Sequence, residues 1–257
     1  MRIELVLAPN PGPMTGPGTN CWVVSSGGEA VVIDPGPDEP AHREAIVDAS
    51  TGLTVAAVLV THLHPDHTPL ANPLGVLLGA PVMGAASGPG FDPDRTLADG
   101  DRVEFGDRSL EVIATPGHTP DSLSYRVDDR LFTGDHIMGG STVIVEDMAQ
   151  YMESLRKVLG IGVEAIHPGH GPVLDRPDDV VAEYLAHRLE RERQVLEAVR
   201  SGAGSVGAVV ERVYADVDRG LHAAAAISVE AHLRKLAGDA LVRFHGAGWH
   251  APVEPVP

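Results

Sequence analysis

The chain has 257 residues, of which 43% are hydrophobic and 21% are charged, so it can hold one large domain with an appendage. No stretch approaches about 18 consecutive apolar residues, which argues against a membrane-spanning helix. The net charge is −17, and residues 1–189 carry 27 acidic against 11 basic side chains. Such a surface repels phosphate backbones, so nucleic acid is not the default substrate.

The first part of the chain predicts short strands separated by turns, followed by helices. Strands are predicted at residues 3–7, 21–25, 30–33 and 56–60, with further short strands between 101 and 132, and helices at 40–50 and 147–159. Residues 9–20 and 84–95 are rich in proline and glycine and predict loops, the second of them mobile. Two similar halves of strands and helices favour an α/β fold, in which helices cover both outer faces of a sheet sandwich.

After Pro172 the predicted elements change from mostly strands to mostly helices. A long amphipathic helix is predicted at residues 178–200, then short helices at 206–213, 221–227 and 229–236, and a small hairpin at 240–250. Three short helices and a hairpin are typical of a winged helix. We therefore predict a first domain at residues 1–175 and a linking helix with a winged-helix-like module at 176–257. The last short helix carries His232, Arg234 and Lys235, but a local charge balance of −1 favours a lid or dimer-packing module over nucleic-acid contact.

Residues 61–67, with the sequence THLHPDH, are the most informative segment. They directly follow the apolar run 56–60, which predicts a buried strand. His62 and His64 point the same way on an extended chain because side chains alternate, and Pro65 then promotes a turn that brings in Asp66 and His67. Imidazole and carboxylate groups are ligands that zinc accepts.

Three later segments also place a potential ligand after a short apolar run. These are TPGHT at 115–119, TGDH at 133–136 and HPGHG at 167–171. Each contains glycine next to the potential ligand, which lets backbone and side chains crowd around a metal. One such histidine is ordinarily a surface residue, whereas four ligand-bearing strand ends in order predict a site.

This series of motifs resembles the ligand pattern of the metallo-β-lactamase-fold hydrolases. Residues 10–15 (NPGPMT), 18–20 (GTN), 33–36 (IDPG) and 134–142 (GDHIMGGST) are similar, more narrowly, to the β-lactamase-like protein 2 subfamily. The resemblance implies the αβ/βα four-layer sandwich for the first domain and a comparable C-terminal appendage. One departure is that residues 68–71 read TPLA where many relatives carry a glycine pair, which concerns the pocket wall and not the ligands.

The resemblance also implies a binuclear zinc site. His62, His64 and His118 would hold one zinc ion, Asp66, His67 and His170 the second, and Asp135 would bridge the two. A hydroxide shared by the metals is then the nucleophile at neutral pH, and Asp66, which accepts a hydrogen bond from it, is the catalytic residue to test first. Iron or manganese also suits these ligand types.

Several other residues lie near the ligands or share their chemistry. Thr61 and Thr119 are candidates either to support a ligand or to cap a strand end, and Asp34 either to support the site or to form a turn. His136 and His167 flank ligands and are expected to point away. The remaining histidines, which lack ligand spacing and are interpreted as ordinary residues, are His42, His187, His222, His232, His245 and His250.

Three function hypotheses follow from these motifs. The first is hydrolysis of an ester or thioester of a small acyl substrate, as in the related thioesterases. The second is cleavage of single-stranded RNA, an activity of β-lactamase-like protein 2 relatives, which the acidic surface and the few aromatic residues disfavour. The third is a winged-helix regulator that binds nucleic acid. The single Cys21 and the absence of a secretory signal pattern predict a cytoplasmic protein, and a homo-oligomer is left open.

Overall fold

The structure is a computed structural model that describes residues 1–139, 143–246 and 248–251. Contacts divide the chain into two compact units, one of residues 1–143 and 160–177 and the other of residues 144–159 and 178–257. Among the described residues, no helix is long and apolar enough to cross a membrane. The domain boundary at residue 175 stays a prediction.

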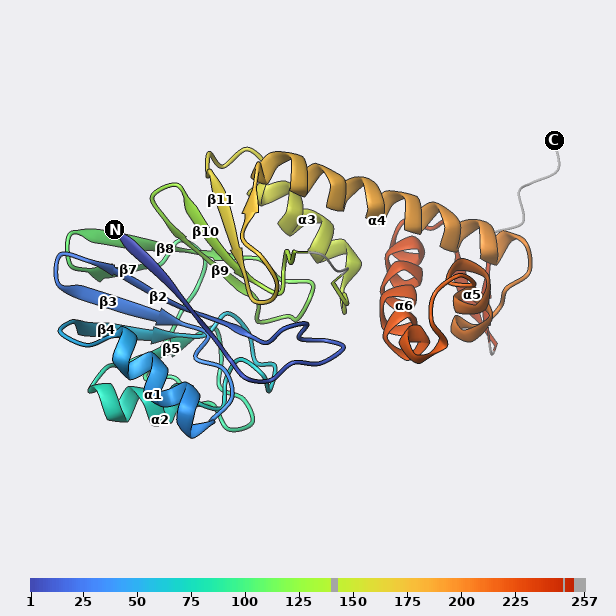
Figure 1. Ribbon diagram of the computed structural model, residues 1–257. Coiled ribbons are helices and arrows are strands. Elements are labelled where there is room, and N and C mark those ends of the chain that lie inside the picture. The colour runs from blue at the N-terminus through green and yellow to red at the C-terminus, as the bar shows by residue number, and fades with distance from the viewer. Residues whose placement is uncertain (140–142, 247, 252–257) are drawn as a thin grey trace. The chain divides into compact units, whose positions relative to one another are not determined.

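Two mixed six-stranded sheets form the first unit (Figure 1). The first sheet contains, in spatial order, β1 (Arg2–Leu7), β2 (Asn20–Ser26), β3 (Glu29–Ile33), β4 (Thr54–Leu59), β5 (Val82–Gly84) and β6 (Arg95–Thr96). The second sheet runs in the order β12 (Leu174–Asp175), β11 (Ala165–Pro168), β10 (Arg130–Gly134), β9 (Leu123–Val127), β8 (Arg108–Ala114) and β7 (Arg102–Phe105). β3, β4, β5 and β6 pair in parallel, as do β10 and β11, while the other neighbours pair antiparallel.

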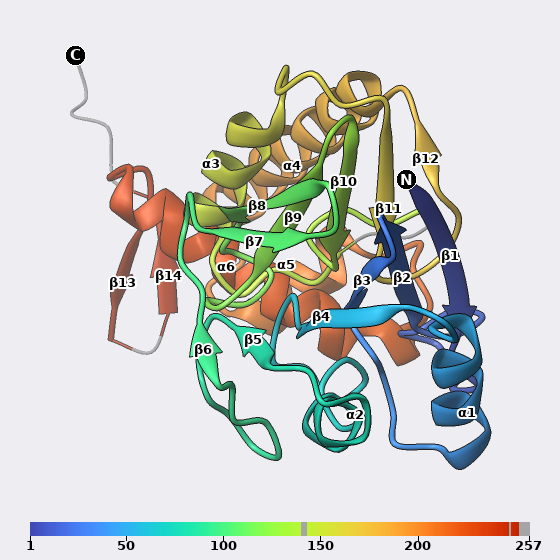
Figure 2. The same cartoon turned by 90° about the vertical axis from the view of Figure 1, so that its left-hand side faces the viewer.

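The sheets pack face to face around one apolar core, and Figure 2 shows strands of one sheet above those of the other. Alternate residues of the central strands enter this core because successive side chains of a strand point to opposite faces. Trp22, Ile33 and Leu59 come from the first sheet, and Tyr125 and Phe132 from the second. The buried Tyr125 hydroxyl donates a hydrogen bond of 2.6 Å to the carbonyl of Val60, which ties the second sheet to the end of β4. The sheet sandwich predicted from the sequence is confirmed.

Helices α1 (Pro40–Ala49) and α2 (Ala71–Leu78) cover the outer face of the first sheet (Figure 1). The sequence did not predict α2, which has no side-chain cap at its start and contains Pro73 and Gly75. Packing requires that glycine, since an added Cβ at Gly75 would lie 2.4 Å from Cγ2 of Val82. The following segment, predicted as a mobile loop, is anchored: Asn72 exchanges two hydrogen bonds with the backbone of Asp92, and Phe91 is buried.

Among its described residues, the second unit contains four helices and a small hairpin. These are α3 (Met148–Val158), α4 (Pro177–Arg200, whose first residue belongs to the first unit), α5 (Val206–Val213), α6 (His222–Gly238), β13 (Arg243–His245) and β14 (Gly248–His250), with a 3-10 turn at Arg219–Leu221. The two short helices predicted at 221–227 and 229–236 are one helix, which corrects that prediction. Ser228 does not cap a new helix, because its hydroxyl accepts a hydrogen bond from the backbone N–H of Val145.

Two glycine-to-alanine changes test this packing. Gly75→Ala should lower the free energy of unfolding by about 1–3 kcal/mol, because the overpacking against Val82 exceeds the helix preference of alanine, which is about 1 kcal/mol. Gly207→Ala in α5 is the matched control, since a Cβ there meets no atom within 4 Å, and it should leave stability unchanged or slightly raised. Denaturant unfolding measures both changes, and a stabilising Gly75→Ala would contradict this account of α2.

Candidate metal centre

Strand direction brings the four ligand-bearing segments to one edge of the sandwich. β8 and β10 are both antiparallel to β9, and β11 is parallel to β10, so these three strands end at the same edge of the second sheet. Their ends lead to His118, Asp135 and His170, respectively. β4 of the first sheet leads to residues 61–67, and the carbonyl of Thr61 accepts a 2.8 Å hydrogen bond from the N–H of Leu123 in β9. The predicted donors therefore meet from both sheets.

Two glycines allow the backbone to pass close to these donors. An added Cβ at Gly169 would lie 2.4 Å from Oδ1 of Asp135 and 2.9 Å from Cε1 of His67. At Gly134 it would lie 2.3 Å from Oγ1 of Thr61, and this residue has a positive φ of 49°. A larger side chain at either position would displace the donors, so these glycines are part of the centre.

The donors form two adjacent clusters, each with its donor atoms within 4.8 Å of one another. The first contains His62, His64, His118 and Asp135, and the second contains Asp66, His67 and His170. All seven predicted ligand residues are thus brought together. The two clusters of histidine and aspartate are consistent with a binuclear site for divalent metal ions.

The first cluster presents imidazole nitrogens to one another. Nε2 of His118 lies 3.1 Å from Nδ1 of His64, and the His62 and His64 rings are 4.7 Å apart in an edge-to-face arrangement. Nε2 of His62 is buried and has no hydrogen-bond partner among the described residues. A buried nitrogen without a partner costs free energy, and a cation coordinated at this position would satisfy it.

The second cluster places one carboxylate, that of Asp66, against two imidazoles. Oδ2 of Asp66 lies 3.1 Å from Nε2 of His170 and 3.4 Å from Nε2 of His67. The two oxygens of Asp135 lie between the clusters: Oδ1 is 3.6 Å from Nε2 of His67, and Oδ2 is 3.8 Å from Nε2 of His118. This position between the clusters is the one expected for a bridging carboxylate.

The two carboxylates are ionised within this buried centre. Burial raises the pKa of Asp66, but hydrogen bonds with His170 and His67 hold that pKa well below its usual range. Burial likewise raises the pKa of Asp135, but interactions with His67 and His170 outweigh this effect and lower it. Burial lowers the pKa of His170, yet Asp135 and Asp66 raise it to about 9. Metal ions bound here would compete with protons for these imidazoles, so metal binding should release protons. The donor set therefore fits divalent cations.

The carboxylate of Asp34 contacts the imidazole of His67 on the side away from the donor cluster. Asp34 follows β3 and is 1% exposed, and Nδ1 of His67 lies 3.0 Å from its Oδ2. The same carboxylate accepts hydrogen bonds of 2.8 Å from both the N–H and the hydroxyl of Thr61. With Nδ1 held by a carboxylate, Nε2 of His67 is oriented towards the cluster, as outer carboxylates commonly orient metal-binding histidines. Both roles considered for Asp34 are therefore found, since it contacts His67 and also lies in a turn with a positive φ of 51°.

Other polar contacts hold the remaining donors. The Thr61 hydroxyl lies 3.0 Å from Nδ1 of His62, whereas the Thr119 hydroxyl lies 2.8 Å from that of Ser122 and caps its turn. Thr19 donates a hydrogen bond of 3.3 Å to Asp66. Nδ1 of His170 lies 3.2 Å from the carbonyl of residue 18. Thr19 was not identified from the sequence, because only the fold brings it to Asp66.

Histidines outside the ligand set occupy other environments. His167 is buried in the sandwich core against the rings of Trp22 and Phe132, both with centroids 4.8 Å away, and burial lowers its pKa to about 4. His136 is also buried, and neither residue belongs to a donor cluster of the described chain. The same is true of His42, His187, His222, His232, His245 and His250.

The support from Asp34 generates a prediction. Asp34→Asn should lower metal affinity about 10–100-fold, the usual cost of losing such an outer contact, because an amide holds the His67 imidazole less strongly than a carboxylate does. Asparagine tolerates the positive φ of 51° at this position, so the fold should survive. Competition with a chromophoric chelator measures the affinity, with the exposed Asp48→Asn as control; equal affinities for the two variants would contradict the role of Asp34.

Comparison with known proteins agrees with this geometry. The family model of the Metallo-beta-lactamase superfamily matches residues 14–170, and that of the Beta-lactamase associated winged helix domain matches residues 205–249. A Beta-lactamase-like protein 2 homolog of Caenorhabditis elegans is 34% identical over 254 residues, which cover 93% of this chain and 85% of that protein. An atrochrysone carboxyl ACP thioesterase of Aspergillus chevalieri is 34% identical over 263 residues, which cover 96% and 84%.

Solved structures share the fold along nearly the whole chain. A Beta-lactamase domain protein from Burkholderia ambifaria has a TM-score of 0.83 at 24% identity and covers 97% of this chain and 91% of its own. A metallo-beta-lactamase family protein from Thermus thermophilus has a TM-score of 0.81 at 20% identity and covers 97% and 98%. The predicted fold class, with its C-terminal winged helix, is confirmed. The chain belongs to the metallo-beta-lactamase superfamily and is a metal-dependent hydrolase.

Proposed function

We propose that this hydrolase cleaves an ester or thioester of a small acyl substrate with two zinc ions bound at its centre. The observation that carries the proposal is the pair of adjacent donor clusters, in which Asp135 of the first cluster also lies 3.6 Å from His67 of the second. In the proposed ligand set, His62, His64 and His118 hold one ion, Asp66, His67 and His170 hold the other, and Asp135 bridges them. Bound there, the ions would activate a water molecule and polarise the scissile carbonyl.

The side chains of the chain itself orient this chemistry. Asp66 is the more accessible of the two clustered carboxylates, with 25% of its side chain exposed against 9% for Asp135. We assign Asp66 to hold the attacking water through a hydrogen bond, and Thr19 fixes its carboxylate from the other side. Asn10 in turn donates a hydrogen bond of 2.9 Å to the Thr19 hydroxyl, so the loop after β1 sets the direction in which Asp66 faces.

A thioester is the favoured substrate class because of the relatives. The Aspergillus relative is named an acyl-carrier thioesterase and is similar over almost the whole chain. Acyl-group hydrolysis requires a nucleophile and a Lewis acid, which two bound metal ions provide. It requires no basic surface, and this agrees with the net charge of −17.

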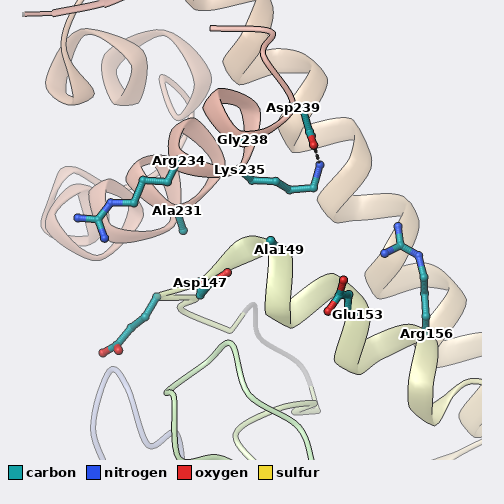
Figure 3. A pocket seen from close by; sticks show the side chains of 10 residues that line it. Asp147, Ala149, Glu153, Arg156, Ala231, Arg234, Lys235, Gly238 and Asp239 are labelled. Carbon is teal, nitrogen blue, oxygen red and sulfur yellow. Dashed lines mark hydrogen bonds and ion pairs between the residues drawn. The ribbon is translucent and has the colours of Figure 1, made fainter. Parts of the chain in front are cut away.

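Single-stranded RNA remains the alternative substrate, and the second unit offers little to bind it. Of the α6 residues considered for nucleic-acid contact, His232 is fully buried. Arg234 pairs with Glu230 at 2.7 Å, and Lys235 pairs with both Glu192 and Asp239. Figure 3 shows Lys235 and Asp239 joined beside a pocket of about 350 Å³. Basic groups neutralised by neighbouring acids attract phosphates weakly, so RNA cleavage and nucleic-acid regulation are not favoured.

The role of Asp66 can be tested by a substitution that conserves size. Asp66→Asn removes the negative charge of the second cluster. We expect turnover to fall about 10²–10⁴-fold, as for loss of a general acid or base, while the fold is retained. Steady-state kinetics and circular dichroism measure the two effects. The exposed Asp48→Asn should keep wild-type turnover, and full activity of Asp66→Asn with both metal ions bound would refute the assignment.

The substrate class can be tested with the zinc-loaded protein and a matched set of compounds. Acyl thioesters of coenzyme A and of acyl carrier protein, aryl esters and a labelled single-stranded RNA are each incubated with it. We expect metal-dependent hydrolysis of thioesters or esters that a chelator abolishes and added zinc restores. Hydrolysis of the RNA alone would replace this proposal with the alternative, and turnover no faster than that of a His64→Ala variant would remove the acyl substrates.

A further inference from the structure

A tight turn after β3 carries Asp34. Asp34 and Gly36 both have positive φ values, of 51° and 79°, and Pro35 lies between them. Few residues adopt this backbone conformation without cost, so the turn persists only if its surroundings hold it. The turn is joined to the neighbouring strand β4 by a hydrogen bond of 2.8 Å from the N–H of Asp34 to the carbonyl of Leu59.

The turn contacts His67 in two ways. Through the side chain, the Asp34 carboxylate lies 3.0 Å from Nδ1 of His67. Through the backbone, the N–H of Gly36 donates a hydrogen bond of 3.1 Å to the carbonyl of His67, and the N–H of Leu70 donates one of 3.0 Å to the carbonyl of Gly36. A shift of the turn would therefore move both the ring and the backbone of His67.

His42 holds the turn from the helix side. It lies on α1, is 3% exposed, and its Nε2 is 2.9 Å from the carbonyl of Pro35. The ring also packs against Gly36, where an added Cβ would lie 3.3 Å from the same nitrogen. Burial lowers the pKa of His42 although its hydrogen bond to Pro35 opposes this, so the ring is neutral and Nε2 is the donor. Its other nitrogen has no partner among the described residues.

We propose that His42 is a positioning residue for the metal centre, acting through the Pro35 turn and Asp34 on His67. The proposal rests on the ligand set given under Proposed function. From the sequence alone, His42 is interpreted as an ordinary residue because it lacks ligand spacing. The hydrogen bond to Pro35 gives it a specific effect: without the donor, the turn relaxes, and His67 binds the second ion less tightly.

Three variants separate this role from simple core packing. His42→Leu removes the donor and keeps an apolar side chain. His42→Gln places an amide nitrogen as many bonds from the backbone as Nε2 and should restore the hydrogen bond. Ile46→Val perturbs the only other residue among the described residues of α1 that is buried, one turn further along, and it keeps the His42 donor to Pro35.

The measurement is zinc affinity by competition with a chelator, together with denaturant unfolding of the metal-free proteins. We expect His42→Leu to weaken one of the two binding steps about 10-fold, the low end for an outer contact, while His42→Gln and Ile46→Val bind as the wild type does. Asp34→Asn should weaken the same step. The double variant with His42→Leu should then lose less affinity than the two single losses combined, because both act through His67.

Specific results would overturn the proposal. These are wild-type affinity in a folded His42→Leu, an equal loss in Ile46→Val, a His42→Gln variant no better than His42→Leu, or additive losses with Asp34→Asn. Failure of the wild type itself to bind two ions would instead refute the proposed function. The two failures are therefore distinguishable within the same titration.

Discussion

The buried carboxylate of Asp34 is the contact on which the metal centre depends. It receives two hydrogen bonds from Thr61 and faces the ring of His67, so one side chain fixes both the first residue and the last residue of the ligand-rich segment. Residues 61–67 lie outside the strands, and the hydrogen bond from Leu123 of β9 reaches only Thr61 at their start, so the Asp34 contacts also hold the end of the segment in place. A buried carboxylate is stable only when it is fully hydrogen-bonded or paired, and this requirement makes the arrangement specific.

The same requirement governs the donor clusters. Asp66 and Asp135 place two negative charges in a mostly buried site, and neighbouring imidazoles must neutralise them when no metal ion is bound. Divalent cations bound here would balance these charges and would also satisfy nitrogens such as Nε2 of His62. The centre is thus unfavourable as a purely structural core, and its composition is explained by metal binding.

Sequence patterns located the segments that carry the proposed ligands but not the residues that support them. The seven proposed donors follow apolar runs, so periodicity located the strand ends, and the resemblance to the metallo-β-lactamase hydrolases selected the individual donors. Thr19 and His42 carry no such signal, because their contacts with Asp66 and Pro35 arise from the tertiary fold. Helix α2 was missed since packing against Val82, and not local propensity, selects Gly75. The sequence prediction divided α6 into two helices at Ser228. In the structure the Ser228 hydroxyl instead accepts a hydrogen bond from Val145, a contact that only the tertiary fold creates.

X-ray absorption spectroscopy of the zinc-loaded protein tests the central claim most directly. The account predicts two zinc ions per chain, bound by nitrogen and oxygen ligands without sulfur, and a metal–metal separation of about 3.5–4 Å. The single Cys21 is buried within β2 and should not contribute. A single ion without a metal neighbour, or a shell that contains sulfur, would contradict the binuclear centre that the two adjacent clusters support.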